Sequence, residues 1–152
     1  MKKPFFFQHL FLIIVTSFSI HLTGNAQIAG TSGSLSVDPV TPTVVDPLIT
    51  VGGTADLTNA TVQITANYYS GDVLSFDAGL AGSFGISGSY STTDVSGILS
   101  FSGTTSPANW QAIFRTVTYK NGSASCGPSS RTIIFLQGQY LYNSFNGLIL
   151  FF

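Results

Sequence analysis

The chain has 152 residues, of which 44% are hydrophobic and only 7% are charged, a size that suits one domain of about 100 to 125 residues after an N-terminal leader. The six acidic residues are all aspartates and both histidines precede residue 27, so three cations (Arg115, Lys120 and Arg131) against six aspartates leave a net charge of −3 once the leader is removed. This balance excludes nucleic acid as a partner, because phosphate binding needs a basic face.

Residues 1–26 have the features of a cleavable signal peptide. An MKK start supplies positive charge, residues 5–22 form an apolar segment, and small residues, including Ala26, stand at the minus-three and minus-one positions of a cleavage site. Cleavage would make Gln27 the first residue and would place the protein at the cell surface or outside the cell. An uncleaved membrane anchor is the alternative, since about 18 residues almost span a bilayer. A lipoprotein is excluded because the only cysteine is Cys126.

Residues 27–43 are rich in glycine, serine, threonine and proline, a composition typical of an extended linker. Short segments with alternating apolar residues follow and predict strands separated by turn-forming clusters. The expected strands are residues 48–51, 61–69, 73–76, 86–91, 98–102, 115–120 and 132–136. Helical periodicity is limited to one turn within 107–114, and the glycine-rich residues 79–88 are expected to connect two strands flexibly. This pattern predicts an all-β protein, an antiparallel Greek-key β-sandwich in a single domain.

The segment 97–135 has the order strand, apolar bridge, strand, polar loop and strand. Its sequences TSPANWQAIFRTVTY and RTIIF resemble the strand-to-strand crossover of bacterial cadherin-like and immunoglobulin-like adhesin repeats. The matching positions are Trp110, Gln111, Ile113, Phe114, Val117, Tyr119, Arg131, Thr132, Ile133 and Phe135. Upstream, ATVQITANYYSGDVLSF and GISGSYSTTDVSGILSFSG are similar to other elements of the same repeat, so the resemblance covers residues 44–138.

The resemblance implies a cadherin-like or immunoglobulin-like sandwich, one repeat of a multi-repeat surface protein that is apparently truncated here. Its implied partners are neighbouring repeats or an extracellular protein or glycan ligand. It implies no particular ligand-binding residue.

The side chains after residue 26 offer little catalytic chemistry, because they include no histidine, no glutamate, one lysine and one cysteine. The aspartates are dispersed in turns, which disfavours a carboxylate pair, and zinc lacks ligands. Calcium is the metal alternative, because it binds carboxylate and carbonyl oxygens and because some cadherin-like repeats hold it. Its candidate ligands are Asp46, Asp56 and Asp72. We expect no catalytic site and no cofactor or metal, with these aspartates in ordinary turns.

Cys126 and the aromatic residues leave alternatives open. Cys126 lies in a polar loop without a neighbouring base, so it is either a tolerated loop residue or a site of intermolecular disulfide formation. Trp110, Phe114 and Tyr119 form either a sugar-stacking platform or part of the core. Their positions at the bridge and in the following strand favour the core.

Residues 139–152 depart from the pattern of the repeat. One explanation, which we favour, is a truncated or frameshifted reading frame. The other is a hairpin in which Asn146 and Gly147 form the turn and residues 148–152 supply a closing strand.

These features predict an exported, non-enzymatic β-sandwich module, a spacer or binding repeat of a surface or extracellular adhesin, with no stable membrane span after cleavage. A small outer-membrane β-barrel is one alternative, because the chain ends in phenylalanine. A carbohydrate-binding or carbohydrate-processing domain is another, which would require aspartates beside exposed aromatic residues.

Overall fold

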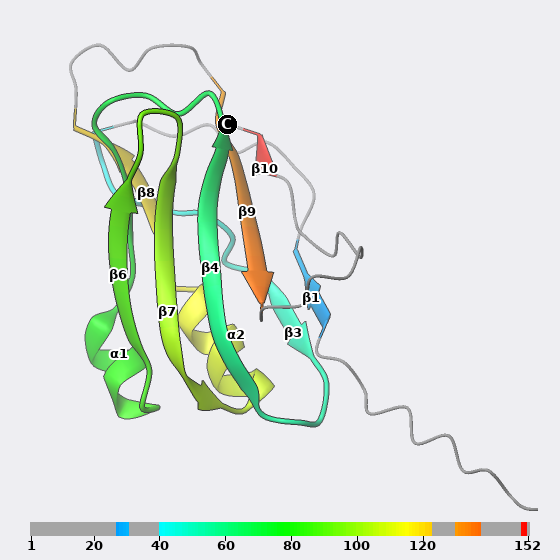
Figure 1. Ribbon diagram of the computed structural model, residues 1–152. Coiled ribbons are helices and arrows are strands. Elements are labelled where there is room, and N and C mark those ends of the chain that lie inside the picture. The colour runs from blue at the N-terminus through cyan, green and yellow to red at the C-terminus, as the bar shows by residue number, and fades with distance from the viewer. Residues whose placement is uncertain (1–26, 31–39, 123–129, 138–149, 152) are drawn as a thin grey trace, which may run out of the picture.

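The computed structural model describes residues 27–30, 40–122, 130–137 and 150–151. The leader, Cys126 and the expected turn at Asn146 and Gly147 lie outside these residues. The described chain is mostly β-structure in antiparallel sheets, with two short helices (Figure 1). The elements are β1 (Gln27–Ala29), β2 (Thr43–Val44), β3 (Thr50–Gly52), β4 (Leu57–Ala66), β5 (Asp72–Ser75), α1 (Ala78–Ser83), β6 (Ser87–Thr92), β7 (Gly97–Thr105), α2 (Pro107–Phe114), β8 (Thr118–Asn121), β9 (Thr132–Gln137) and β10 (Leu150–Phe151).

The largest sheet has the strand order β10-β9-β4-β7-β6, with every neighbouring pair antiparallel. Its central strand β4 alternates as expected from its sequence. Val62 and Ile64 are fully buried, whereas the intervening Gln63 is half-buried on the opposite face. Val62 lies opposite Leu99 of β7 and Phe135 of β9, both also buried, so the apolar face of the sheet is continuous across three strands.

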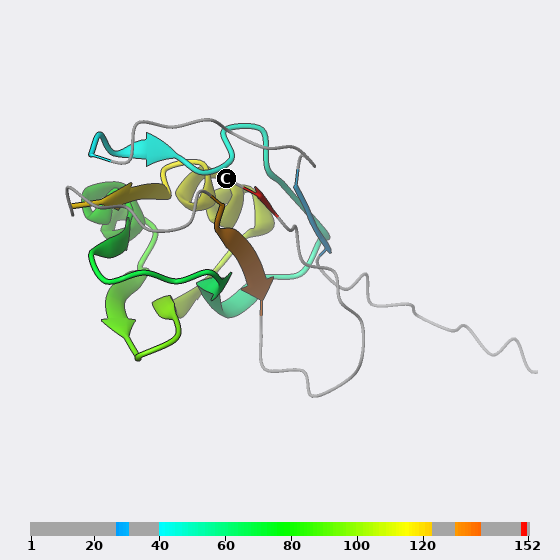
Figure 2. The same cartoon turned by 90° about the horizontal axis from the view of Figure 1, so that it is seen from above.

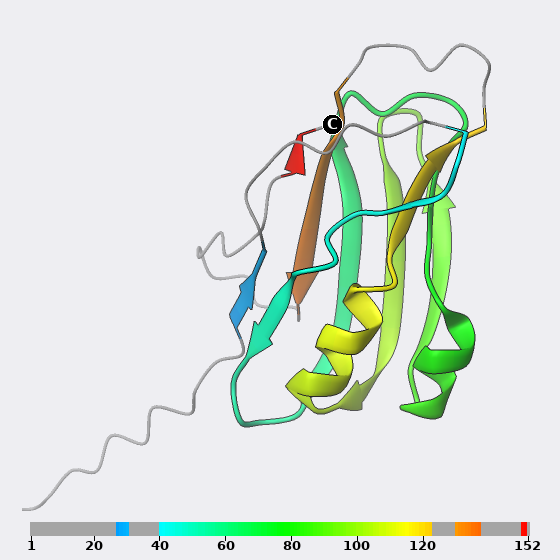
Figure 3. The same ribbon diagram turned by 180° about the vertical axis from the view of Figure 1, so that it is seen from behind.

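A second layer covers that apolar face. It consists of the three-stranded sheet β2-β8-β5, the two-stranded sheet β1-β3 and both helices, all of which lie behind the large sheet in Figure 1 and in front of it in Figure 3. Figure 2 shows the two layers end-on. Apolar side chains of both layers form one core between them. The expectation of two packed antiparallel layers is confirmed.

The chain passes from one layer to the other through α2, which joins β7 of the large sheet to β8 of the small one. Ser106 begins the helix, because its Oγ accepts a hydrogen bond from the Asn109 N–H at 3.4 Å. Trp110 and Phe114 are 0% exposed on the inner side of the helix. Tyr119, in the strand that follows, is 4% exposed. These aromatic residues are therefore core, and the sugar-stacking interpretation is wrong for them.

Two local predictions were wrong. The glycine-rich connection is partly helical, because residues 78–83 form α1, whose first turn is capped by the Asp77 carboxylate accepting from the Leu80 N–H at 2.9 Å. The expected linker also contributes to the fold, because Gln27–Ala29 pairs with β3 and Ile28 is buried at 6% exposure.

The end of the chain approaches the edge of the large sheet. Leu150 pairs with Ile133 and Phe151 pairs with Thr132, so β10 lies antiparallel to β9. This pairing lies at the edge of β9 where the closing-strand alternative expects a strand, and it does not test the frameshift explanation. The segment that joins β9 to β10 lies outside the described residues.

Candidate functional site

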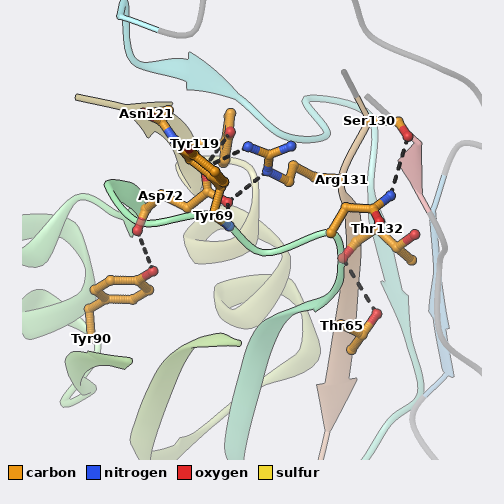
Figure 4. A network of polar contacts seen from close by, with 10 residues as sticks. Thr65, Tyr69, Asp72, Tyr90, Tyr119, Asn121, Ser130, Arg131 and Thr132 are labelled. Carbon is orange, nitrogen blue, oxygen red and sulfur yellow. Dashed lines mark hydrogen bonds and ion pairs between the residues drawn. The ribbon is translucent and has the colours of Figure 1, made fainter. Parts of the chain in front are cut away.

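The most unusual group in the described chain is the buried carboxylate of Asp72, at the first position of β5. Asp72 is 1% exposed, and its ion-pair partner Arg131, just before β9, is 3% exposed. The Arg131 Nε donates to Asp72 Oδ2 at 2.7 Å, and its Nη2 donates to Oδ1 at 3.3 Å. The pair therefore joins the small sheet to the large one at the end where β4 ends and β9 begins (Figure 4).

Two side chains of β8 complete the set of donors from the sheets. The Tyr119 hydroxyl donates to Asp72 Oδ1 at 2.8 Å, and the Asn121 Nδ2 donates to the same oxygen at 2.6 Å. Asn121 lies directly opposite Asp72 in the β5–β8 ladder and is fully buried. We call Asp72, Tyr119, Asn121 and Arg131 the Asp72 cluster.

The same carboxylate fixes the turn that precedes it. The Tyr69 N–H donates to Asp72 Oδ2 at 2.8 Å, while the Asp72 N–H donates to the Tyr69 carbonyl at 3.0 Å. Gly71, with φ of 95°, occupies a position of this turn that other residues rarely adopt. Its carbonyl accepts from the Gly122 N–H at 3.1 Å, so the turn is also held to the end of β8.

The hairpin β6–β7 also contacts Asp72, in this case through the Asp72 backbone. The Tyr90 hydroxyl donates to the Asp72 carbonyl at 2.7 Å. The ring reaches that position across Gly97, where an added Cβ would collide with the Tyr90 hydroxyl. The small residue at position 97 is therefore required by the path of the tyrosine side chain.

The surroundings shift the pKa of three members of this network. Burial raises the pKa of Tyr90 to about 12, and electrostatic interactions with Tyr68 and with the Asp72 carboxylate add to the shift. Burial also raises the pKa of Tyr119, and its hydrogen bond to the Asp72 carboxylate raises it further. For Arg131, burial alone would lower the pKa, but the hydrogen bonds and charge of Asp72 outweigh it, so the pKa is raised. Both tyrosines remain neutral and Arg131 remains charged at ordinary pH.

This arrangement is suited to holding structure rather than to catalysis or metal binding. A carboxylate offers about four acceptor positions, and Asp72 receives donors from Tyr69, Tyr119, Asn121 and Arg131. A carboxylate that is 1% exposed and bonded in this way is shielded from solvent. Its chemistry is to fix the relative positions of the segments that supply its donors.

The candidate calcium ligands are not brought together. Asp46 is buried at 1% exposure, and its Oδ1 accepts from the Leu48 N–H at 2.9 Å, as in an ordinary aspartate turn. Asp56 is exposed, whereas Asp72 is committed to its cluster. Among the described residues, no group of three histidine, cysteine or acidic side chains is placed to hold a metal ion.

A shallow depression of about 230 Å³ lies on the outer face of the large sheet. Strands β6 and β7 line it with four serines, Gly88 and Phe101. Two of the serines, Ser87 and Ser102, bond to each other through their hydroxyls at 2.8 Å. The lining contains no acid, base or metal ligand, so it has no catalytic set.

The Asp72 cluster is not predictable from the sequence. From the sequence, Asp72 is expected in a turn or as a calcium ligand, and Arg131 is only a matching position of the repeat pattern. The sequence does contain one indication of the cluster. Asp72 and Arg131 each stand at the start of a strand, directly after a loop rich in glycine and serine.

Comparison of the chain with protein-family models, with curated proteins and with solved structures finds no match in any of the three.

Proposed function

We propose that this protein is an exported, non-enzymatic β-module that serves as a spacer or binding repeat of a cell-surface or extracellular adhesin. The observation that carries the proposal is the crossover through α2, flanked by the Asp72–Arg131 pair. Both features occupy positions of the sequence that resemble cadherin-like and immunoglobulin-like adhesin repeats.

The distribution of charge supports a mechanical role. The buried ion pair is used to hold loops and strands at one end of the two layers, and the described aspartates outside it either serve in turns and caps or are exposed. A β-module whose loops are fixed at its ends presents those loops, or a neighbouring module, in a defined orientation.

The strand order differs from that of an immunoglobulin-like Greek-key sandwich. In immunoglobulin domains strands F and G, which follow each other in the chain, pair in one sheet, whereas here the consecutive strands β8 and β9 lie in different sheets, β8 between β2 and β5 and β9 between β4 and β10. The proposal therefore rests on the crossover and the ion pair rather than on strand order.

Export is tested by expressing the complete chain with its own leader in a bacterial host. The expected result is a product outside the cytoplasm whose first residue by mass spectrometry is Gln27. A matched control replaces Ile13 and Ile14 with aspartate, which interrupts the apolar segment and should retain the protein in the cytoplasm. A mature product that keeps residues 5–22 would contradict cleavage.

Adhesion is tested separately on the cleaved form. Cells that display the protein should retain it at the surface as a protease-accessible domain and should aggregate or bind a coated surface more than cells that lack it. If the protein is exported but shows neither effect, the proposed localisation would stand and the proposed adhesin function would be wrong.

A further inference from the structure

We propose that the edge strand β6 (Ser87–Thr92) is a self-pairing surface through which two copies of this chain join their large sheets. The two β6 strands would lie antiparallel about a two-fold axis. The inference stands on the geometry of this edge and does not depend on export or adhesion.

Strand β6 is the last strand of the large sheet in the part of the chain that the structure describes. It lies at the left edge of the sheet in Figure 1. All its residues are exposed except Tyr90, which is half-buried. Even Gly88, which faces the inner layer beside the Phe76 ring, is exposed. The residues of this edge are therefore accessible to solvent, and helix α1 contacts the strand from the second layer.

Strand β6 lacks the protections of an edge strand that sequence and register provide. Exposed edges are commonly blocked by lysine, proline, a bulge or a very short strand. Strand β6 has the sequence SGSYST, without charge or proline, and pairs with β7 over six consecutive positions without a register shift. It is thus a regular and unblocked template for a further strand.

The direction of the backbone groups follows from the hairpin. The Thr93 N–H donates to the Ser96 carbonyl at 2.8 Å, which makes these residues a hydrogen-bonded pair in register with the ladder. Because such pairs alternate along an antiparallel ladder, Gly88, Tyr90 and Thr92 direct their N–H and C=O groups away from β7. These groups are the ones that an added strand would bond.

A second copy fits this edge because the strand is complementary to itself. If the two-fold axis passes beside Tyr90, Gly88 lies opposite Thr92 of the partner subunit, and Ser89 lies opposite Ser91 of the partner subunit. The facing serines would then reproduce the hydroxyl pair that Ser87 and Ser102 already form within the sheet.

The charge of the sheet favours the same occupant. Identical strands bring identical side chains close together, so any charge near the axis would repel its own copy. Strands β4, β6, β7 and β9 contain no acidic or basic residue. The shallow depression beside β6, lined by four serines, leaves the outer face without bulky side chains that would obstruct the partner.

Pairing of β6 with itself about a two-fold axis would stop at two copies. At the opposite edge of the sheet, β10 pairs with the first two residues of β9. A two-fold interface uses the β6 edge of both copies, so neither copy has a free β6 edge and the assembly is closed. A single pair of strands buries less than a standard interface, and we expect a dissociation constant of about 0.1 mM.

The test uses sedimentation equilibrium of the cleaved chain over a range of concentration, together with hydrogen exchange. The average mass should rise toward twice the monomer mass, and the amides of Gly88, Tyr90 and Thr92 should exchange more slowly at high concentration. The edge variant Ser89→Lys with Ser91→Lys should remain monomeric. The control variant, Thr61→Lys with Gln63→Lys, carries the same charges in the same rows of the sheet but two strands from the edge, and should dimerise like the wild type.

A charge-swap variant identifies the register. The variant Ser89→Asp with Ser91→Asp should also be monomeric alone, and mixing it with the lysine variant should restore a dimer. This restoration also shows that both variants are folded. A wild type that stays monomeric to 10 times the expected dissociation constant, edge variants that still dimerise, or a mixture that fails to dimerise would each overturn the proposal. Protection of these amides only after a different extended peptide is added would overturn it in favour of that partner.

Discussion

At the scale of single residues, the most informative group is a carboxylate that is buried for a structural purpose. Burying an ion pair costs desolvation of both charges, and the attraction between them compensates only when the geometry is good and the remaining positions are bonded. Asp72 meets both conditions, because Arg131 approaches it with two nitrogens and Tyr119 and Asn121 bond the oxygen that Arg131 holds less closely. The pair should therefore be strongly coupled.

Removing either partner should be costly, because the other charge remains buried. We expect Asp72→Asn and Arg131→Met each to lower the free energy of unfolding by about 3–5 kcal/mol. The double variant should lose clearly less than the sum of the single losses. Urea unfolding of the four proteins measures this coupling. The control Asp94→Asn, at an exposed aspartate of the β6–β7 hairpin, should stay within about 0.5 kcal/mol of the wild type. Additive losses would contradict a coupled pair.

Tyr90 makes stability dependent on pH in the alkaline range. Its pKa is about 12 in the folded protein against 10.0 for an ordinary tyrosine, so the folded state keeps a proton that the unfolded chain releases. The resulting stabilisation is complete below pH 10 and is lost as pH rises to about 12. In Tyr90→Phe, which also lacks the hydrogen bond to the Asp72 carbonyl, this loss should be absent.

The measurement compares urea midpoints of wild type and Tyr90→Phe from pH 7 to pH 12. The wild type should be more stable by a constant amount up to about pH 9, and the difference should shrink above pH 10. A difference that stays constant to pH 12 would show that Tyr90 does not retain its proton in the folded state.

At the scale of elements, the strands were predictable from sequence for a local reason, whereas only one helical turn was expected within 107–114, where α2 has eight residues. Alternating apolar residues such as Val62 and Ile64 predict a half-buried strand wherever they occur. The ends of strands were less predictable, because β4 stops at Ala66 where Asn67 adopts a positive φ of 57°. The expected strand over 61–69 therefore runs three residues too far.

Helix α1 could not be predicted from its own residues. Its sequence AGLAGS contains two glycines, which disfavour helix, and six residues are too few for an independent helix. The helix is formed because Asp77 caps it and because Ala81 is fully buried in the core. Both contributions depend on the tertiary structure.

Helix α2 contains the main test of the core. Trp110 is 0% exposed, and its ring centroid lies 5.6 Å from that of Phe114. Its Nε1 donates a hydrogen bond to the Leu57 carbonyl at 2.9 Å. We expect Trp110→Ala to lower the free energy of unfolding by about 3–5 kcal/mol. Ala108→Ser, at an exposed position of the same helix, should change it by no more than about 0.5 kcal/mol. An indole fluorescence typical of solvent exposure would count against the packing described.

At the scale of the whole molecule, sequence indicated two β-layers but not how they are joined at the Asp72 cluster. Asp72 and Arg131 are 59 positions apart, and no local pattern pairs an aspartate with an arginine at that distance. The crossover could be predicted from the sequence because its aromatic residues lie within one short segment. The open edge at β6 could not be predicted, because it depends on which strand comes last in the sheet.

The long separations within the Asp72 cluster also have a consequence for the lifetime of the folded state. Tyr119 and Asn121 lie 47 and 49 positions from Asp72, so the cluster is completed only after β8 and the start of β9 have docked. Closing such loops early is entropically unfavourable, and we expect the contacts to form after the rate-limiting step of folding.

Arg131→Met should therefore leave the refolding rate nearly unchanged and increase the unfolding rate by a factor of about 100 or more. The faster unfolding would then account for nearly all of the expected loss of stability. Stopped-flow measurements across a urea series separate the two rates, with Asp94→Asn as the control. An equal slowing of refolding would show that the cluster forms early. For a protein that works outside the cell, as proposed, the unfolding rate determines how long each molecule survives, and a single buried arginine would set that duration.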